Sequence, residues 1–390
     1  MMTISSPKGS NAERSRITNR RAVMGSIHSA GIMGRAEIAR NLSLSTQAVS
    51  NIIAELLEDG LLFENGTRAG GRGLPAVQYA VNPDGGYAFG IEVRPSAIFG
   101  SLLDMHGKPV FTERFALKDA RPNAVIEHVI ALRDKGLKAV SISDDKLLGA
   151  GIVMPGPFGR TGLAGQESDL PEWDSVDPHK LFEDALEIPV MVSNDANAAA
   201  MAERITGVAQ GLSSYAYLYF GTGLGLGIVS QGHLVPGAFG NAGEIGHVAV
   251  PIDGQMRSLE SVLSRLSAQR KLQGDYEQAL DFQSIADLFA AQDSELMEWL
   301  DTASIALGHA TQIIENLFDP QTIILGGAMP SGVLDYLVEN TTLPELTVSN
   351  RSARSEPRLK TGTSDRLTAT LGAAALILNQ TYTPQFVVAH

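Results

Sequence analysis

The sequence predicts an α/β protein in which an N-terminal winged helix-turn-helix domain precedes a two-lobed body. For the body, a β-rich outline begins at Tyr87 and again at Tyr215, and helical and β-rich segments alternate after each copy. For the head, three short helical patterns precede two β-rich runs. The expected boundaries are 1–82 for the winged helix-turn-helix domain, 83–195 for the first α/β lobe and 196–390 for the second, whose C-terminal helix is a candidate to pack back on the first lobe.

The composition restricts the class of protein. The chain has 390 residues, of which 44% are hydrophobic, so it can bury a large core. No stretch reaches the roughly 20 apolar residues of a membrane span, and the N-terminal segment lacks the apolar core of a signal peptide. We therefore expect a cytoplasmic protein without a membrane partner. The absence of cysteine excludes disulfides, thiolate metal ligands and cysteine nucleophiles.

Charge is distributed unevenly along the chain. The formal net charge is −13, but residues 1–80 hold nine Lys or Arg against six Asp or Glu. The head is therefore mildly basic and the body strongly acidic. Because an acidic surface is repelled by phosphate backbones, the head is the candidate for binding nucleic acid.

Apolar residues at helical spacing predict the three helices of the head. They are Val23, Ile27 and Ile32 in the first helix, Ile38 and Leu42 in the second, and Val49, Ile52, Ile53 and Leu56 in the third. A helix-turn-helix presents the N-terminal part of its second helix to base edges, where Gln and Asn pair bidentately with adenine. The polar residues expected on that face are Ser45, which is also a good N-cap, Thr46, Gln47, Ser50 and Asn51.

The two β-rich runs that follow, LLFE and AVQYAVN, predict a hairpin that forms the wing. Arg68 and Arg72 near its tip are expected to contact phosphates or the minor groove. The third helix contains no Lys or Arg, so phosphate contacts must come from the wing and from other arginines of the head. These are Arg16, Arg20, Arg21, Arg35 and Arg40. The alternative interpretation of the head is a small helical protein-interaction domain with a flexible linker.

A glycine-rich segment, FGTGLGLGIV, lies within the second β-rich copy and has the composition of a phosphate-binding loop. In a duplicated fold, the equivalent connection of the first copy faces it across the cleft. That connection reads Arg94-Pro95-Ser96-Ala97, in which proline removes an amide donor and the side chains hinder close approach. Half of a phosphate clamp is therefore missing. The alternative role of the glycines is packing in a tight hairpin, and residual nucleotide binding at Gly221–Gly227 stays open.

Several motifs together give the chain a recognisable pattern. They are GIVMPGP (151–157), LPEW (170–173), SNDANAAAMAE (193–203), FGTGLGLGIV (220–229), NAGEIGHVAV (241–250) and the junction AGGRGLPAVQYAVNPDGGYAFGIEV (69–93). Over nearly its whole length the chain resembles the ROK family (repressor, open reading frame, kinase), specifically the transcriptional regulators of that family. The resemblance implies an actin-like, sugar-kinase-type two-lobed fold, a hexose-type ligand in the cleft, and dimers or tetramers.

The chain departs from the family pattern at two places. Family kinases carry an acidic residue followed by Gly-Gly-Thr at the first phosphate loop, whereas GIEVRPSA offers Glu92 and none of the rest. We therefore expect no kinase activity. The family's cysteine-rich zinc segment is also missing, which leaves His247 with little else for a tetrahedral zinc site. We predict no structural zinc and no other cofactor.

The resemblance further implies a sugar site. Asp195 matches the general base of the family kinases, and Asn194 matches an asparagine that binds neighbouring hydroxyls. Glu244 and His247, three residues apart, would share a face of a helical turn and match ligands of sugar hydroxyls. Glu260 matches a further glutamate of the family. The structural alternatives are an N-cap for the Asn-Asp pair and a packing role for the histidine.

These inferences predict a sugar-responsive transcriptional regulator, a repressor of carbohydrate-utilisation genes. The head would bind operator DNA, the body would bind a monosaccharide effector, and the chain would act as a homodimer or homotetramer. Cleft closure would change the spacing of the two heads. The alternative function is an ATP-dependent sugar kinase with an added DNA-binding head, and a third is an interaction protein with an empty cleft.

Overall fold

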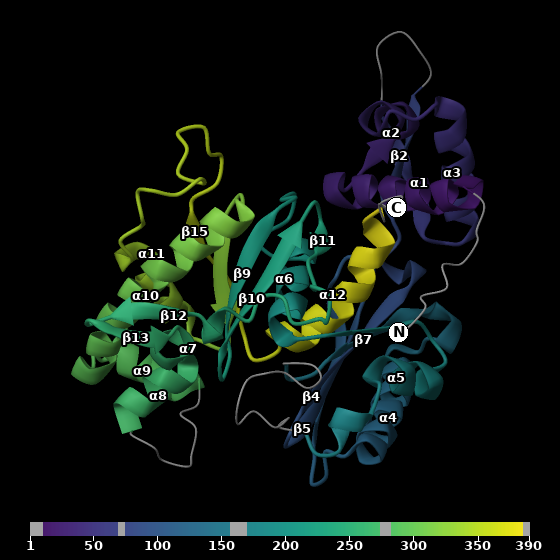
Figure 1. The fold of residues 1–390 in the computed structure, drawn as a ribbon. Helices are drawn as coiled ribbons and strands as arrows, with labels where there is room; N and C mark the ends of the chain where they lie inside the picture. Colours follow the sequence, from purple (N-terminus) through teal and green to yellow (C-terminus); the bar gives the residue numbers. More distant parts are fainter. Residues whose placement is uncertain (1–10, 69–74, 157–169, 274–281, 385–390) are drawn as a thin grey trace.

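The computed structural model describes residues 11–68, 75–156, 170–273 and 282–384. It has a head at the N-terminus and a body of two α/β lobes (Figure 1), so the predicted fold class is confirmed. The head contains three helices and a small antiparallel sheet of strand order β1-β3-β2. Its elements are α1 (Asn11–Ala30), β1 (Met33–Gly34), α2 (Arg35–Leu42), α3 (Thr46–Glu58), β2 (Leu62–Arg68) and β3 (Ala76–Val81).

The head follows the predicted helical pattern with two differences. Helix α3 begins after Ser45, whose hydroxyl oxygen accepts a hydrogen bond from the Ala48 amide at 3.1 Å. Ile32 does not belong to the first helix, because Gly31 turns the chain with φ +77° and leaves the Ile32 side chain 48% exposed. Strand β2 continues beyond the predicted LLFE, because its pairing with β3 resumes after a register shift between Glu64 and Thr67.

The first lobe contains a five-stranded sheet of order β6-β5-β4-β7-β8. Its first three strands form an antiparallel meander, and the last two are added parallel to β4. Helices α4 and α5 pack against the sheet. The elements are β4 (Tyr87–Arg94), β5 (Ala97–Leu103), β6 (Pro109–Ala116), α4 (Pro122–Val140), β7 (Leu147–Val153), α5 (Pro178–Leu186) and β8 (Val190–Ser193).

The second lobe repeats this topology with the order β11-β10-β9-β14-β15, which agrees with the internal duplication inferred from the sequence. Its core elements are α6 (Asp195–Ile205), β9 (Tyr215–Phe220), β10 (Leu224–Ser230), β11 (His233–Leu234), α10 (Ser294–Phe318), β14 (Ile323–Gly327), α11 (Ser331–Asn340) and β15 (Leu359–Ser364). Smaller elements precede α10, namely β12 (Ala249–Ile252), β13 (Gln255–Ser258), α7 (Glu260–Leu263), α8 (Arg265–Gln273) and α9 (Phe282–Ala290).

Helices α6 and α12 (Thr368–Tyr382) join the two lobes. Helix α12 packs against β4, β5 and β7 of the first sheet, and α6 packs against β9 and β10 of the second. The two helices also lie against each other, because glycines allow their backbones to approach. A Cβ atom at Gly372 of α12 would overlap the carbonyl oxygen of Ala198 of α6. Gly151 of β7 likewise lets α12 approach the first sheet, because a Cβ atom there would overlap the carbonyl oxygen of Ala373.

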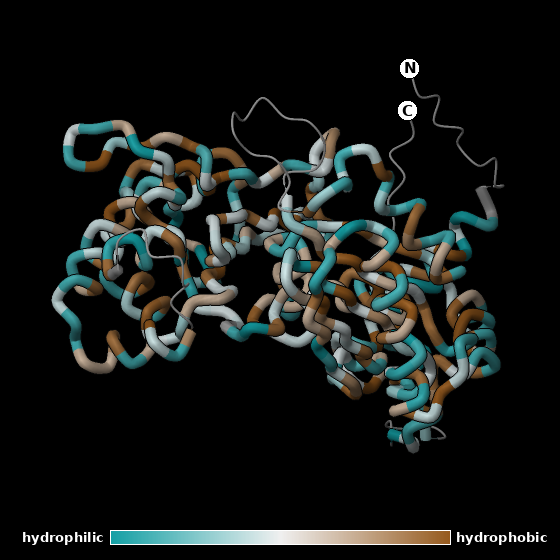
Figure 2. Tube along the Cα trace, turned by 90° about the horizontal axis from the view of Figure 1, so that it is seen from below, coloured by the Kyte–Doolittle hydropathy of each residue, from teal (hydrophilic) through white to brown (hydrophobic). Residues whose placement is uncertain are grey.

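Apolar residues are buried inside the head and inside each lobe, and Figure 2 shows hydrophobic segments in brown among hydrophilic ones along the chain. One of the buried clusters is shared between the head and the joint of the lobes. It includes Val23 and Ile27 of α1, Met201 of α6, and Leu378 and Tyr382 of α12. The head is therefore packed on the body rather than tethered to it. Among the described helices, none is both long enough and apolar enough to cross a membrane.

Candidate functional site

The N-terminus of α6 places two of the predicted sugar residues beside the glycine-rich connection of β9 and β10. Asn194 is the N-cap, since its side-chain oxygen accepts a hydrogen bond from the Asn197 amide at 2.9 Å. Asp195 is the first helical residue, and its Oδ1 accepts a hydrogen bond from the Ala196 amide at 2.9 Å. Its Oδ2 is directed toward Gly221, where a Cβ atom would lie 3.5 Å away.

The other three predicted sugar residues lie together in the second lobe. His247 lies between two carboxylates, with Nε2 3.7 Å from Glu244 Oε2 and Nδ1 3.6 Å from Glu260 Oε1. Gly156 connects this group to α6, because a Cβ atom there would lie 3.5 Å from Glu244 Oε1 and 3.9 Å from Asn194 Cβ. The structure thus brings all five residues into one polar cluster. That this cluster binds a sugar stays a prediction.

The charges of the cluster change the acidity of its members. Burial, and then the charges of Glu92 and Glu244, raise the pKa of Asp195 to about 6, against the opposing effects of the Ala196 amide and Arg94. Burial also raises the pKa of Glu244, while His247 acts in the opposite direction. Above a pH of about 6 the Asp195 carboxylate is ionised and accepts hydrogen bonds from hydroxyl groups, so it suits a polyol ligand.

Replacing Asp195 by Asn is expected to stabilise the protein at neutral pH. With its pKa raised from 3.8 to about 6, the folded chain keeps a proton that the unfolded chain releases. Ionisation of Asp195 therefore lowers the free energy of unfolding as the pH rises from about 4 to about 6. The gain of the variant over the wild type should grow by up to about 3 kcal/mol across this window. Urea unfolding of both proteins at several pH values measures it, and a difference independent of pH would contradict the assignment.

The first hairpin connection differs from a glycine-rich loop in its chemistry. Arg94 Nε donates a hydrogen bond to Glu92 Oε1 at 2.5 Å, and the guanidinium lies 4.6 Å from the ring centre of Phe99. The other oxygen of Glu92, a residue only 4% exposed, accepts a hydrogen bond from Thr370 Oγ1 at 2.6 Å. Sequence reasoning missed this pair. Its signal was the spacing of two residues on one strand, which places both side chains on the same face.

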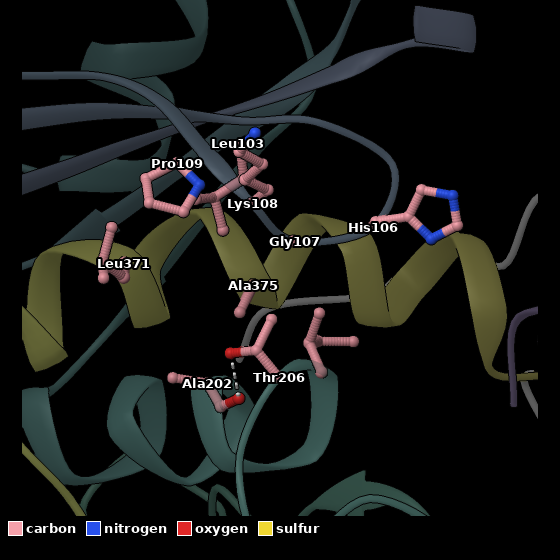
Figure 3. Close-up of a pocket in the computed structure, with 10 residues that line it drawn as sticks. Leu103, His106, Gly107, Lys108, Pro109, Ala202, Thr206, Leu371 and Ala375 are labelled. Atoms are coloured by element: carbon pink, nitrogen blue, oxygen red, sulfur yellow. Dashed lines mark hydrogen bonds between the residues drawn. The ribbon is translucent and has the colours of Figure 1, made fainter. Parts of the chain in front are cut away.

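A cavity of about 250 Å³ lies between the turn of β5 and β6 and the helices α6 and α12 (Figure 3). Its walls are mainly apolar. The lining residues include Leu103, Pro109, Ala202, Ile205, Leu371 and Ala375. None of the predicted sugar residues lines this cavity, so the polar cluster and the cavity are separate features of the joint between the lobes.

The predicted DNA-binding face is exposed on α3. Thr46, Gln47 and Asn51 are exposed and Ser50 is half-buried. The Gln47 amide nitrogen donates a hydrogen bond to Asn51 Oδ1 at 2.9 Å, which orients both side chains. The exposed Ser45 hydroxyl caps the helix, so structure alone accounts for this residue.

The arginines of the head divide into two groups. Arg35 on α2 is exposed, with its guanidinium 5.7 Å from the ring centre of Tyr79, and Arg68 is exposed at the end of β2. Arg72 lies outside the described residues. Two of the other expected phosphate contacts face α3 instead, since Arg16 Nη2 lies 2.9 Å from Glu55 Oε1 and Arg20 pairs with Asp59. The Arg16 side chain stays 65% exposed beside its partner. That these two arginines contact phosphates stays a prediction.

Substitutions in the head should separate specificity from affinity. Asn51→Ala is expected to cost about 1–3 kcal/mol on the preferred sequence and less on others, because a base contact is lost. Arg68→Ala should weaken binding to all sequences and flatten the dependence on salt, because a phosphate contact is lost. Fluorescence anisotropy with operator and random duplexes at several salt concentrations measures both. If both variants lose the same affinity on operator and random duplexes and show the same salt dependence, α3 is not the recognition helix.

Comparisons with known proteins agree with this arrangement. A model of the ROK family matches residues 89–380. A xylose repressor of Bacillus spizizenii is 27% identical over 299 residues, which cover 75% of this chain and 77% of that repressor.

Two solved structures cover different shares of the chain. A ROK family transcriptional regulator, a homologue of the E. coli MLC protein, has a TM-score of 0.72 at 22% identity and covers 95% of this chain and 97% of its own. A ROK hexokinase from Thermus thermophilus has a TM-score of 0.57 at 24% identity and covers 74% of this chain and 97% of its own. The likeness to the regulator therefore includes a part of the chain that the likeness to the hexokinase leaves out.

Proposed function

The chain belongs to the ROK family, and we propose from this premise that it is a sugar-responsive transcriptional repressor of carbohydrate-utilisation genes. The observation that carries the proposal is the combination of a helix-turn-helix head and a polar cluster between two α/β lobes on one chain. The likeness to a xylose repressor over 75% of the chain supports the same function.

The alternative, a sugar kinase with an added head, is less well supported. At the connection of β4 and β5, the Arg94 guanidinium donates a hydrogen bond to Glu92, whereas a kinase needs backbone amides there to bind the phosphates. We propose that Asp195 serves as a hydrogen-bond acceptor for hydroxyl groups and not as a base in phosphoryl transfer. Release of ADP that depends on sugar, above the level of Asp195→Ala, would reverse this conclusion.

The packing of the helices suggests how sugar binding reaches the head. Helix α6 begins at Asp195 and lies along α12. Helix α12 ends at Tyr382, whose ring stacks on His28 of α1 with ring centres 4.2 Å apart and an interplanar angle of 20°. Burial, and then His106 and Arg204, lower the pKa of His28 to about 4, so this contact is uncharged at neutral pH. Movement of one lobe on the other would therefore shift α1.

The test is a thermodynamic cycle with the full chain. Thermal-shift screening of monosaccharides identifies a ligand, since one at 100 times its dissociation constant adds about 2.7 kcal/mol. Sugar affinity is then measured with and without operator, and operator affinity with and without sugar. Linkage requires that sugar change operator affinity by the same factor by which operator changes sugar affinity. The corresponding coupling free energy is commonly about 1–3 kcal/mol. A sugar affinity that is the same with and without operator, or the absence of sugar binding, would contradict the proposal.

Three further points belong to the proposal. A repressor of this kind would act in the cytoplasm, where the DNA lies. It would be a homodimer or homotetramer, because operators commonly have two half-sites. It would contain no zinc, since His247 faces carboxylates and the chain has no cysteine. Sedimentation of the purified protein and analysis of its metal content test the last two points.

A further inference from the structure

The cavity at the joint between the lobes (Figure 3) has walls from both of them. Leu103 and Pro109 flank the turn of β5 and β6 in the first lobe, and Ala202 lies near the end of α6. Leu371 and Ala375, four residues apart, present one face of α12. Because these elements come from the two lobes and from the helices that join them, a movement of one lobe on the other changes the shape of the cavity.

The turn of β5 and β6 rests directly on the end of α6. Gly107 in this turn has φ +79°, a conformation that favours glycine. A Cβ atom there would lie 2.6 Å from one methyl carbon of Ile205 and 2.6 Å from one of Thr206. The Thr206 hydroxyl donates a hydrogen bond to the Ala202 carbonyl oxygen at 3.3 Å. A ligand in the cavity would therefore contact the turn of the first lobe and the end of α6 at the same time.

The same turn touches the segments that join the body to the head. The Met105 carbonyl oxygen accepts a hydrogen bond from the hydroxyl of Tyr382, the last residue of α12. The ring centre of His106 lies 6.2 Å from that of His28 on α1. His106 also lines the cavity. Occupation of the cavity would therefore act on a turn that contacts both α12 and the head.

The cavity has a cationic side chain at its edge. Lys108 is an exposed lining residue, and no Asp or Glu is among the described residues that line the cavity, although the body as a whole is acidic. Asp104, on the same turn, accepts hydrogen bonds from the amides of His106 and Lys108 at 2.8 and 2.9 Å, so its carboxylate is held by the turn. Within the ranges that the structure describes, no carboxylate forms an ion pair with the Lys108 ammonium group. This arrangement favours an anionic ligand.

The size and the chemistry of the cavity specify the class of ligand. Its volume is about 250 Å³, and an apolar cavity of about 150 Å³ is large enough to bind benzene. The apolar walls can take up a hydrocarbon body, and the Lys108 ammonium group is a single point charge that suits one carboxylate. Among the described lining residues there is no arginine, which would bind a phosphate group through paired hydrogen bonds.

We propose that this cavity is the site of a second effector, a small monocarboxylate with an aliphatic or aromatic body. Binding at this site is independent of the proposed sugar site, and only its effect on operator rests on the proposed function. An effector shifts an equilibrium by its differential affinity for the two conformations. The carboxylate would favour the arrangement of the lobes in which the cavity is open, and the turn of β5 and β6 would pass this preference to α12 and α1.

The binding test compares carboxylates with uncharged and with smaller counterparts. The full-length protein is titrated calorimetrically with benzoate and hexanoate, with benzamide and hexanamide, and with acetate. Benzoate or hexanoate should bind at least about 10-fold more tightly than its amide, because the amide lacks the charge that pairs with Lys108. It should also bind at least about 10-fold more tightly than acetate, because acetate has almost no apolar surface to bury.

Two variants and a matched control locate the site. Ala202→Leu places a larger side chain in the cavity wall and should remove the binding of carboxylates and amides alike. Lys108→Gln should keep the affinity for the amide and reduce the preference for the carboxylate to within about 3-fold. Lys118→Gln is the control, because Lys118 is exposed beyond the other end of β6 and does not line the cavity. Thermal unfolding shows whether each variant is folded.

The effect on DNA is measured by fluorescence anisotropy with operator. The carboxylate at saturation should change the operator affinity of the wild type at least about 3-fold, and Ala202→Leu should lose this change. Because linkage is reciprocal, operator should change the affinity for the carboxylate by the same factor.

The outcomes separate this inference from the proposed function. If no carboxylate binds more tightly than its amide, or if Ala202→Leu or Lys108→Gln binds as the wild type does, the inference is overturned and the repressor function is unaffected. If the carboxylate binds as expected but only sugar changes operator affinity, the role as an effector site is overturned and the repressor function stands. If neither ligand changes operator affinity, the proposed function fails and the effector role with it, while the binding site stands.

Discussion

Asp195→Asn is expected to abolish the response of operator binding to sugar while operator affinity itself stays close to that of the wild type. The substitution is nearly isosteric and removes the charge that accepts hydrogen bonds from hydroxyl groups. A hydrogen bond to a charged group contributes about 1.5–3 kcal/mol, so sugar affinity should fall roughly 10- to 150-fold. Operator affinity should be kept because Asp195 lies at the start of α6 in the body, whereas the proposed DNA-binding face lies on α3 of the head.

The structure excludes a simpler explanation for such a loss. Asn194, not Asp195, caps α6, so the variant keeps the hydrogen bond that starts the helix. Asp174→Asn is a matched control, because Asp174 is exposed on the first lobe. Operator binding is measured by anisotropy with and without sugar for all three proteins. An Asp195→Asn protein that responds to sugar as the wild type does would show that the polar cluster is not the sensor.

Gly25→Val should leave sugar affinity intact but remove the effect of bound sugar on operator binding. Gly25 lies on α1 where the helix crosses the end of α12, and a Cβ atom there would overlap the carbonyl oxygen of Tyr382. Backbone cannot yield as a flexible side chain can, so a branched residue must push α1 away from α12. The cost of such overpacking is about 1–3 kcal/mol.

The control for Gly25→Val is Ser29→Val, because Ser29 is exposed on the same helix. Both variants introduce a branched residue into α1, but only the first disturbs the contact with α12. Sugar affinity is measured with and without operator, and wild type should show a difference that Gly25→Val loses and Ser29→Val keeps. A Gly25→Val protein with the wild-type difference would show that the coupling does not pass through this contact.

Sequence reasoning succeeded where neighbours along the chain decide the outcome. The spacing of Val49, Ile52 and Leu56 predicted the buried face of α3, and Ser45 predicted its first turn. The repeated outline from Tyr87 and Tyr215 predicted two hairpins of the same form, because strand alternation and tight turns are local properties. The five members of the polar cluster came from the family resemblance, since no local pattern joins residues on separate elements.

The local pattern failed wherever a distant segment supplied the partner. The ion pair of Arg16 with Glu55 was not foreseen, because Glu55 comes within reach only when α1 crosses α3. Likewise, Glu92 is held by Thr370 from a helix at the far end of the chain. Ile32 failed for a local reason instead, because the neighbouring Gly31 ends the helix and leaves Ile32 exposed.

The sequence by itself therefore determined the helices of the head, the two hairpins of the body and the acidic body behind a basic head. Only the tertiary structure decided which charges meet, that Asn194 rather than Asp195 caps α6, and that α12 packs against both α6 and α1. The physical reason is that secondary structure follows from hydrogen bonds and burial repeated over a few residues. Ion pairs, pKa shifts and contacts between helices depend on how segments hundreds of residues apart pack around one core.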